Sequence, residues 1–180
     1  MYKLILLSFF YFLNQDPSSW QVYTDPDSLF SILTPGEVQS KEQLITTETG
    51  DNVINSVFYT SSVDSTDNFI YLINYQKLTE DLYLDDSLDV NYEVLDLFVQ
   101  DIGANLNADL LYVNKSFQHE YPALEYRMQY GESLNQVKGK LILTRTHLYS
   151  IQVYTTKQYS LNKNMEKFFN SFFLLDQSKN

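Results

Sequence analysis

Four strand-like segments follow one another with only two or three residues between them: 110–117, 121–130, 134–145 and 148–156. In the second of these, Leu124, Tyr126 and Met128 alternate with polar residues, which is the period of a strand with one buried face. Strands joined by such short turns pair antiparallel, because a parallel crossover needs about a dozen residues or more. The sequence therefore predicts an antiparallel meander, and this feature constrains the fold most.

Five further strands are predicted before the meander, at residues 20–23, 29–33, 38–49, 53–61 and 69–75. The polar segment 38–49 resembles an edge strand. The turn that follows it is assigned to Gly50, Asp51 and Asn52, which tolerate the positive φ of a hairpin. Segment 69–75 is apolar at almost every position, and this predicts a central strand that is covered on both faces.

Two helices are predicted from apolar residues that recur with a period of 3.6. The first has Ser87 as its N-cap and ends at Gly103, and the second opens at Ser160. The predicted buried stripes are Val90, Val94, Leu97, Phe98 and Ile102 in the first helix, and Leu161, Met165, Phe168, Phe169 and Phe172 in the second.

These elements predict an α+β fold, a twisted antiparallel sheet of about seven strands with helices packed on it. The chain has 180 residues, a length that suits one domain. Its 15 Tyr and 12 Phe favour strands, because their rings pack well on a pleated surface. No repeat and no linker rich in Gly or Pro divides the chain.

The N-terminal segment has the anatomy of a secretory signal. Lys3 precedes an apolar run of about ten residues, and polar residues follow from Asn14. The run is too short for a membrane-spanning helix, which needs about 20 residues. We predict a secretory signal over residues 1–15 and a single domain over 16–180, secreted or periplasmic and without a membrane span. The alternative is a buried first strand or helix.

The charge of the chain argues against binding to nucleic acids. The formal net charge is −11, and such a surface repels phosphate backbones. Residues 78–114 contain nine acidic residues and neither Lys nor Arg, whereas residues 115–180 contain five acidic and nine basic residues. This asymmetry fits a solvated acidic helix beside a balanced sheet, or a polarised surface that orients a partner.

The candidate catalytic and metal-binding residues do not form a complete motif. The chain has no cysteine, which excludes disulfides, thiolate zinc sites and a cysteine nucleophile. His119 and Glu120 form half of a zinc-protease motif, but no second histidine follows at the required spacing. A metal site shared by His119 and His147 is a weak alternative. Residues 131–135 lack the second glycine of a nucleophile elbow and fit a hairpin turn.

The acidic residues allow two further alternatives. A cluster in and before the first helix departs from the spacing of a calcium loop and lacks its glycine, so a solvated loop at a helix N-terminus fits it better. The cluster consists of Asp81, Asp85, Asp86 and Asp89. Glu125 and Glu132 could pair for sugar hydrolysis only if a cleft brought them together. No catalytic residue, metal ligand or cofactor is predicted.

Five tyrosines lie on successive predicted strands: Tyr112, Tyr126, Tyr130, Tyr149 and Tyr154. We expect most of them in the core with hydroxyls that reach the rim. If several of them share an uncovered face, they form an aromatic binding surface.

The order of elements resembles the Mog1/PsbP-like superfamily, especially its small exported bacterial members of unknown function. The matching pieces are Trp20 and Tyr23, residues 30–32 with Pro35, residues 121–123, 141–149 and 168–172, and they span nearly everything after Asn14. The resemblance implies an antiparallel sheet with helices around it and a role in binding or assembly. Plant and cyanobacterial members assist photosystem II and Mog1 binds a small nuclear GTPase, but no functional residue of either matches here.

The leading functional hypothesis is a non-enzymatic module outside the cytoplasm that binds a protein or an envelope component. The second hypothesis is a small-molecule carrier or a hydrolase with an aromatic-lined pocket. A deep pocket with converging polar groups would favour the second, and a flat exposed patch the first. Self-assembly through the edge strand 38–49 is a third possibility.

Overall fold

The computed structural model describes residues 20–47, 50–61, 67–78 and 87–175. The predicted signal segment, residues 1–15, lies outside the described residues. In the described ranges, neither helix combines the length and the apolar character that crossing a bilayer requires.

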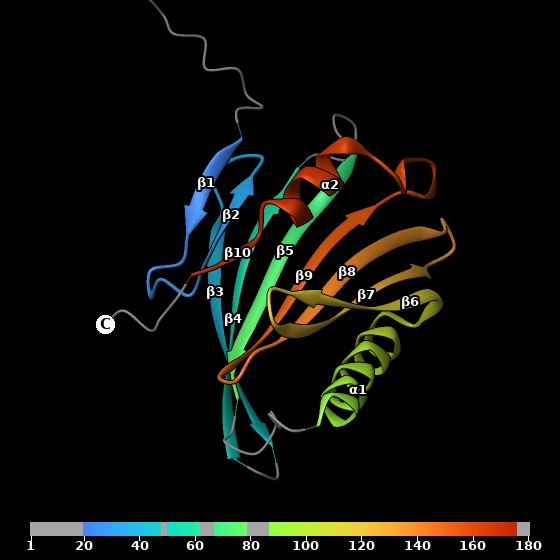
Figure 1. Ribbon diagram of the computed structural model, residues 1–180. Helices are drawn as coiled ribbons and strands as arrows, with labels where there is room; N and C mark the ends of the chain where they lie inside the picture. The colour runs from blue at the N-terminus through green and yellow to red at the C-terminus, as the bar shows by residue number, and fades with distance from the viewer. Residues whose placement is uncertain (1–19, 48–49, 62–66, 79–86, 176–180) are drawn as a thin grey trace, which may run out of the picture.

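A seven-stranded antiparallel sheet forms the centre of the molecule (Figure 1), and the α+β prediction is confirmed. Its strand order is β3-β4-β5-β9-β8-β7-β6. Strands β6 to β9 form the predicted meander, because each pairs with the next strand in the chain. The strands are β3 (Gln39–Thr47), β4 (Gly50–Thr60), β5 (Asn68–Lys77), β6 (Ala108–Gln118), β7 (Tyr121–Tyr130), β8 (Asn135–Leu143) and β9 (His147–Thr155).

A second, three-stranded sheet covers part of one face of the first. It has the order β1-β2-β10, with β1 at Gln21–Thr24, β2 at Phe30–Thr34 and β10 at Phe173–Leu174. Strands β1 and β2 follow the prediction. Strand β10 was not predicted, because two residues that pair with a strand near the other end of the chain leave no periodic signal.

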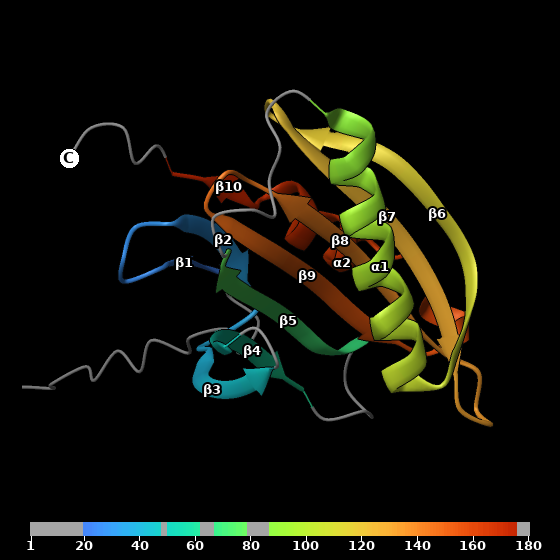
Figure 2. The ribbon, with the colours of Figure 1, turned by 90° about the horizontal axis from the view of Figure 1, so that it is seen from below.

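The large sheet is a middle layer between two helices (Figures 1 and 2). Helix α2 (Lys163–Asn170) and the small sheet lie on one face, where Phe30, Tyr149 and Phe168 belong to one buried cluster. Helix α1 (Leu88–Leu106) lies across β6, β7 and β8 on the other face, where a second cluster includes Leu95 and Tyr126. We refer to these as the α2 face and the α1 face.

Helix α1 begins directly after Ser87, the predicted N-cap, but its C-terminal end and part of its buried stripe differ from the prediction. Helix α1 buries Asn91, Tyr92, Leu95 and Val99, whereas the predicted stripe members Val90 and Leu97 are exposed. It continues past Gly103 to a C-cap at Asn107, which has φ of 48°. Asparagine tolerates the left-handed conformation, so it replaces glycine as the terminator.

Helix α2 begins later than predicted. Its N-cap is Asn162, whose side chain accepts a hydrogen bond of 2.8 Å from the N–H of Met165, so Ser160 is not the first residue. Leu161 therefore lies before the helix and is 77% exposed. Met165, Phe168, Phe169 and Phe172 are buried as predicted.

Two strand details also differ from the prediction. Gly50 is not a turn residue but the start of β4, where it pairs with Thr47. Strand β5 is central, and Tyr71 and Ile73 are buried on its α2 face, but Leu72 and Asn74 on the other face are only partly buried. Helix α1 contacts β6 to β8 instead of β5, so coverage on both faces is incomplete.

Replacing Asn162 with alanine is expected to lower the free energy of unfolding by about 1–2 kcal/mol. The substitution removes the cap to Met165 and also the paired amide bonds to Asn68, at 2.8 and 2.9 Å. Urea denaturation measures the change. Ser160→Ala is the control, and a loss as large as that of Asn162→Ala would contradict the assigned cap.

Candidate functional site

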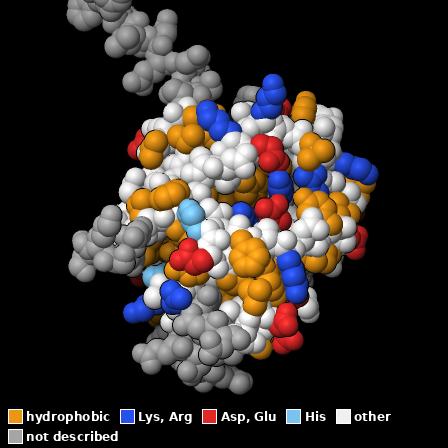
Figure 3. Space-filling view, in the orientation of Figure 1, with side chains coloured by type: hydrophobic (Ala, Val, Ile, Leu, Met, Phe, Trp, Pro, Cys, Tyr) orange, Lys and Arg blue, Asp and Glu red, His pale blue; other side chains and the backbone are white. Residues whose placement is uncertain are grey.

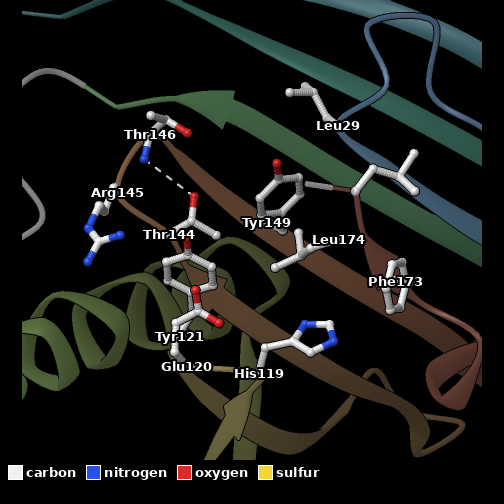
Figure 4. A pocket seen from close by; sticks show the side chains of 11 residues that line it. Leu29, His119, Glu120, Tyr121, Thr144, Arg145, Thr146, Tyr149, Phe173 and Leu174 are labelled. Carbon is white, nitrogen blue, oxygen red and sulfur yellow. Dashed lines mark hydrogen bonds between the residues drawn. The ribbon is translucent and has the colours of Figure 1, made fainter. Parts of the chain in front are cut away.

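A cavity of about 650 Å³ opens where β10 faces the β6–β7 and β8–β9 turns (Figure 4). We call it the hairpin cleft. Its lining is Leu29, His119, Glu120, Tyr121, Thr144, Arg145, Thr146, Tyr149, Phe173, Leu174 and Leu175. Four parts of the chain that are distant in sequence thus meet at one site: Leu29, the two turns and the segment 173–175.

The β6–β7 turn places His119 and Glu120 at the cleft. Gln118 pairs with Tyr121, so the turn contains only His119 and Glu120. His119 has φ of 54°, a conformation that is uncommon outside glycine. Its ring contacts Phe173 edge to face, with 5.1 Å between the ring centroids. A strained backbone thus holds an aromatic wall of the cleft in place.

The β8–β9 turn supplies the opposite end of the cleft. The N–H of Thr144 donates to the carbonyl of His147 at 2.9 Å, and the Thr144 hydroxyl accepts the N–H of His147 at 3.0 Å. These bonds fix a tight turn whose two central residues, Arg145 and Thr146, are exposed. Figure 4 shows Arg145 and His119 at opposite sides of the cavity.

The third wall is the edge strand β10. The N–H of Leu175 donates to the carbonyl of Leu29 at 3.0 Å, so Leu175 directs its backbone groups toward β2. Backbone direction alternates along a strand, and Leu174 therefore directs its N–H and C=O away from β2. The carbonyl of Phe172 shares this outward direction and accepts a 3.2 Å bond from the Gln118 amide. Leu174 is the next residue whose backbone groups face away from β2, and it lines the cleft.

Tyr149 forms the buried floor. Its ring packs on Phe30 and Phe172, with centroid distances of 6.0 and 5.8 Å. Burial raises the pKa of its hydroxyl, and the nearby Asp25 carboxylate raises it further. Asp25 is buried and accepts from the Tyr75 hydroxyl at 2.6 Å and from the Leu29 N–H at 3.3 Å. The floor therefore holds a neutral phenol, and the carboxylate behind it has a structural role.

The side chains of the two histidines contact different aromatic residues. His119 contacts Phe173, whereas His147 packs on Tyr149 and its Nδ1 lies 2.9 Å from the Thr146 hydroxyl. Burial lowers the pKa of His147, and Lys77 lowers it further. Figure 3 shows two separate patches of histidine. No group of three His, Asp or Glu side chains that could hold a metal occurs in the described part of the chain.

The acidic candidates do not converge. Glu125 lies within β7, five residues before its end at Tyr130, and Glu132 is exposed in the following turn. At about 3.4 Å per residue the strand alone separates them by about 17 Å, too far for a glycosidase pair. Asp89 lies in the first turn of α1. Asp81, Asp85 and Asp86 lie outside the described residues.

The tyrosines are divided between the two faces of the sheet. Tyr126, Tyr130 and Tyr154 belong to the cluster under α1, whereas Tyr149 belongs to the α2 face. Tyr112 pairs with Arg127, also on the α2 face. The five residues thus do not form one aromatic surface. The sequence singles out His119 and Tyr149 but not Arg145 or β10. The only local signal for β10 is an aromatic residue, Phe173, just after the second helix.

No protein-family model matches the sequence, and no curated protein matches it. Among solved structures, the chain is similar to cyanobacterial PsbP (CyanoP) from Synechocystis sp. PCC 6803, with a TM-score of 0.49 and 14% identity over 87% of this chain and 93% of that one. It is also similar to PA94, a protein of unknown function from Pseudomonas aeruginosa, with a TM-score of 0.37 and 11% identity over 78% and 85% of the two chains. At this level neither structure assigns a role or a residue to this chain.

Proposed function

We propose that the protein is a non-enzymatic binding module that holds an extended segment of a partner protein in the hairpin cleft. The proposal rests on two observations: β10 is an edge strand whose pairing with β2 directs the backbone of Leu174 away from β2, and Leu174 lines the cavity. An extended peptide can add a strand to such an edge, and its backbone hydrogen bonds supply affinity. The side-chain walls of the cleft then supply specificity.

The walls suit a peptide of mixed character. Phe173 is 50% exposed and, with His119, offers an aromatic surface for an apolar side chain. Glu120 and Arg145 are exposed and place one negative and one positive charge at the rim. A polar rim around an apolar centre is the usual anatomy of a protein interface.

The two buried titratable groups at the floor of the cleft are not available as a catalytic base. The buried phenol of Tyr149 has a raised pKa and is a poor base. The buried carboxylate of Asp25 already accepts hydrogen bonds from Tyr75 and Leu29. General acid–base catalysis needs a titrating group within hydrogen-bond reach of the substrate, and neither residue supplies one.

A second candidate function is a carrier of small molecules. The cavity volume of about 650 Å³ lies within the ~300–1,000 Å³ of ligand pockets, and two tyrosines line it. A small molecule held by side chains does not need the backbone of Leu174, whereas an added strand does. A substitution that removes only this backbone donor separates the two functions.

The substitution Leu174→Pro is expected to abolish partner capture and to leave the fold intact. Proline removes the outward N–H but not the Leu175 bond to Leu29, and edge strands tolerate proline. A photo-crosslinking phenylalanine derivative at position 173 reports capture in producing cells. We expect one major protein adduct, reduced about tenfold or more by Leu174→Pro at an unchanged melting temperature.

The matched control carries the same crosslinker at Tyr159, which is exposed on the short helix Lys157–Tyr159, outside the cleft lining. An adduct that persists in Leu174→Pro, or that forms equally from position 159, would contradict strand addition. If the crosslinker at position 173 captures only a small molecule, and still does so in Leu174→Pro, the carrier function is favoured.

We also propose that the module works outside the cytoplasm, as a secreted or periplasmic protein. The support is the charged and then apolar composition of residues 1–13. Mass spectrometry of the protein purified from envelope and medium is expected to find an N-terminus within about three residues of Asn14. A cytoplasmic protein that retains Met1 would overturn this part of the proposal.

A further inference from the structure

Three basic residues lie next to one another on the α2 face of β7 and β8, and we call them the basic lane. They are Arg127, Lys138 and Lys140. Their position follows from the pleat, because Tyr126 and Leu141, which neighbour them in sequence, belong to the cluster under α1. Arg127 and Lys138 are directly opposite each other in the strand register.

The two lysines have carboxylate partners. Lys138 lies 2.8 Å from a carboxylate oxygen of Glu166 on α2, and its ammonium lies over the ring of Phe169. Lys140 lies 3.7 Å from a carboxylate oxygen of Glu125 and 2.9 Å from the amide oxygen of Gln118. Each lysine charge is thus matched by one acidic side chain.

Arg127 has no such partner among the described residues. Its guanidinium contacts the amide oxygen of Gln136 at 3.5 Å and lies 5.7 Å from the ring centroid of Tyr112. Its Nε is buried and has no hydrogen-bond partner. The residue as a whole is only 8% exposed, so its side chain is a buried cation held between an aromatic ring and an amide.

This arrangement is costly unless an anion completes it. A buried charge is unfavourable without a counter-charge, and two like charges directly opposite each other in a sheet add repulsion. A buried polar atom without a partner also requires a physical explanation, and an absent ion or water is a common one. An oxyanion at the guanidinium would offset all three costs at once, because arginine presents a planar fork of donors that matches carboxylate and phosphate.

The distribution of charge over the molecule favours the approach of an anion to the α2 face. Helix α1 on the opposite face has Asp89, Glu93, Asp96 and Asp101 and no basic residue. The basic lane brings three cations together with two carboxylates, so its local charge is positive in a chain with a net charge of −11. Figure 3, in the orientation of Figure 1, shows basic and acidic side chains side by side near the middle of the face that includes α2.

We infer that the basic lane is an oxyanion-binding site in which Arg127 binds a carboxylate or phosphate group and Lys138 adds a second positive charge. The site is separate from the hairpin cleft, and it does not depend on the function proposed there. Glu166 and Glu125 lie 2.8 and 3.7 Å from the two lysines, so the three cations and two carboxylates leave one positive charge for an anion to match.

Backbone NMR titration of the full chain at low ionic strength tests the site. Inorganic phosphate and succinate are added in parallel, with sodium chloride at matched ionic strength as the reference. We expect saturable shifts at Arg127 and Lys138 and at the Nε–H of the guanidinium, with either phosphate or succinate. The anion that saturates at the lower concentration identifies phosphate or carboxylate as the preferred group.

Three variants make the result specific. Arg127→Gln is expected to weaken binding about tenfold or more, since hydrogen bonds to charged groups are the strong ones. Lys138→Gln leaves the guanidinium in place and is expected to weaken binding several-fold, and it remains informative if Arg127→Gln does not fold. Lys163→Gln, an exposed lysine on α2, is the control without effect. Shifts that do not saturate, or that sodium chloride alone also produces, would overturn the inference. So would shifts that stay unchanged in Arg127→Gln or in Lys138→Gln. The partner of Nε would then be water.

Discussion

Replacing Phe168 with alanine is expected to lower the free energy of unfolding by about 3–5 kcal/mol. Phe168 is 1% exposed, and its ring meets Tyr71 edge to face at a centroid distance of 5.1 Å. It links α2 to the large sheet, so its removal leaves a cavity between two layers that cannot close without moving the helix. Urea denaturation monitored by circular dichroism measures the loss.

Leu161→Ala is the matched control for Phe168→Ala. Both residues belong to the apolar stripe predicted from the sequence, but Leu161 is 77% exposed before the helix begins. Its truncation should change the free energy of unfolding by less than about 0.5 kcal/mol. Equal losses for the two variants would mean that the stripe is buried as the sequence predicted and that the helix starts earlier.

The substitution Gly139→Ala is the second large effect, and we expect a loss of about 3 kcal/mol or more. An alanine Cβ at this position of β8 would overlap Cζ of the Tyr126 ring, which no pair of non-bonded atoms allows. Tyr126 is fully buried and its hydroxyl accepts a 2.9 Å bond from the Gln152 amide, so the ring has no room to move. Overpacking alone typically costs about 1–3 kcal/mol, and the broken hydrogen bond adds to it.

Thermal and urea denaturation of two further variants separate this clash from a general cost of losing glycine. Gly103→Ala in α1 adds a Cβ at 3.5 Å from Met128, an ordinary contact, and should stabilise the protein by up to about 1 kcal/mol. In a Tyr126→Leu background, Gly139→Ala should cost clearly less than in the natural sequence. Purely additive effects of the two substitutions would show that Tyr126 does not lie over Gly139.

The meander was predictable because each strand is long and contacts its neighbour in the chain. Alternation in residues 121–130 is a local signal, and the predicted bounds of β7 match the structure. The C-terminal end of α1 was not predictable in the same way, because Asn107 and Gly103 are both acceptable terminators by local chemistry. The N-cap Ser87 was predicted correctly. Packing on β6 to β8 selects the buried side of the helix, which is why Leu97 is exposed and Leu95 is buried.

The candidate site was only partly accessible from the sequence. The sequence singled out His119 as part of an incomplete metal motif. In the structure His119 lies in a strained turn, and its ring forms an aromatic wall of the cleft with Phe173. Strand β10 depends on pairing between Phe173 and Ser31, which are far apart in the chain. Contacts of this kind leave no periodicity, so the cleft could not be assembled before the fold was known.

The most direct test of the proposed function is hydrogen exchange at two neighbouring amides, Leu174 in β10 and Leu175 directly after it, measured by NMR with and without the crosslinked partner. In the free protein we expect slow exchange at Leu175, whose N–H is bonded to Leu29, and fast exchange at Leu174, whose N–H faces the cleft. In the complex Leu174 should become protected while Leu175 stays unchanged. A Leu174 amide that exchanges equally fast in the free protein and in the complex would contradict strand addition at this edge.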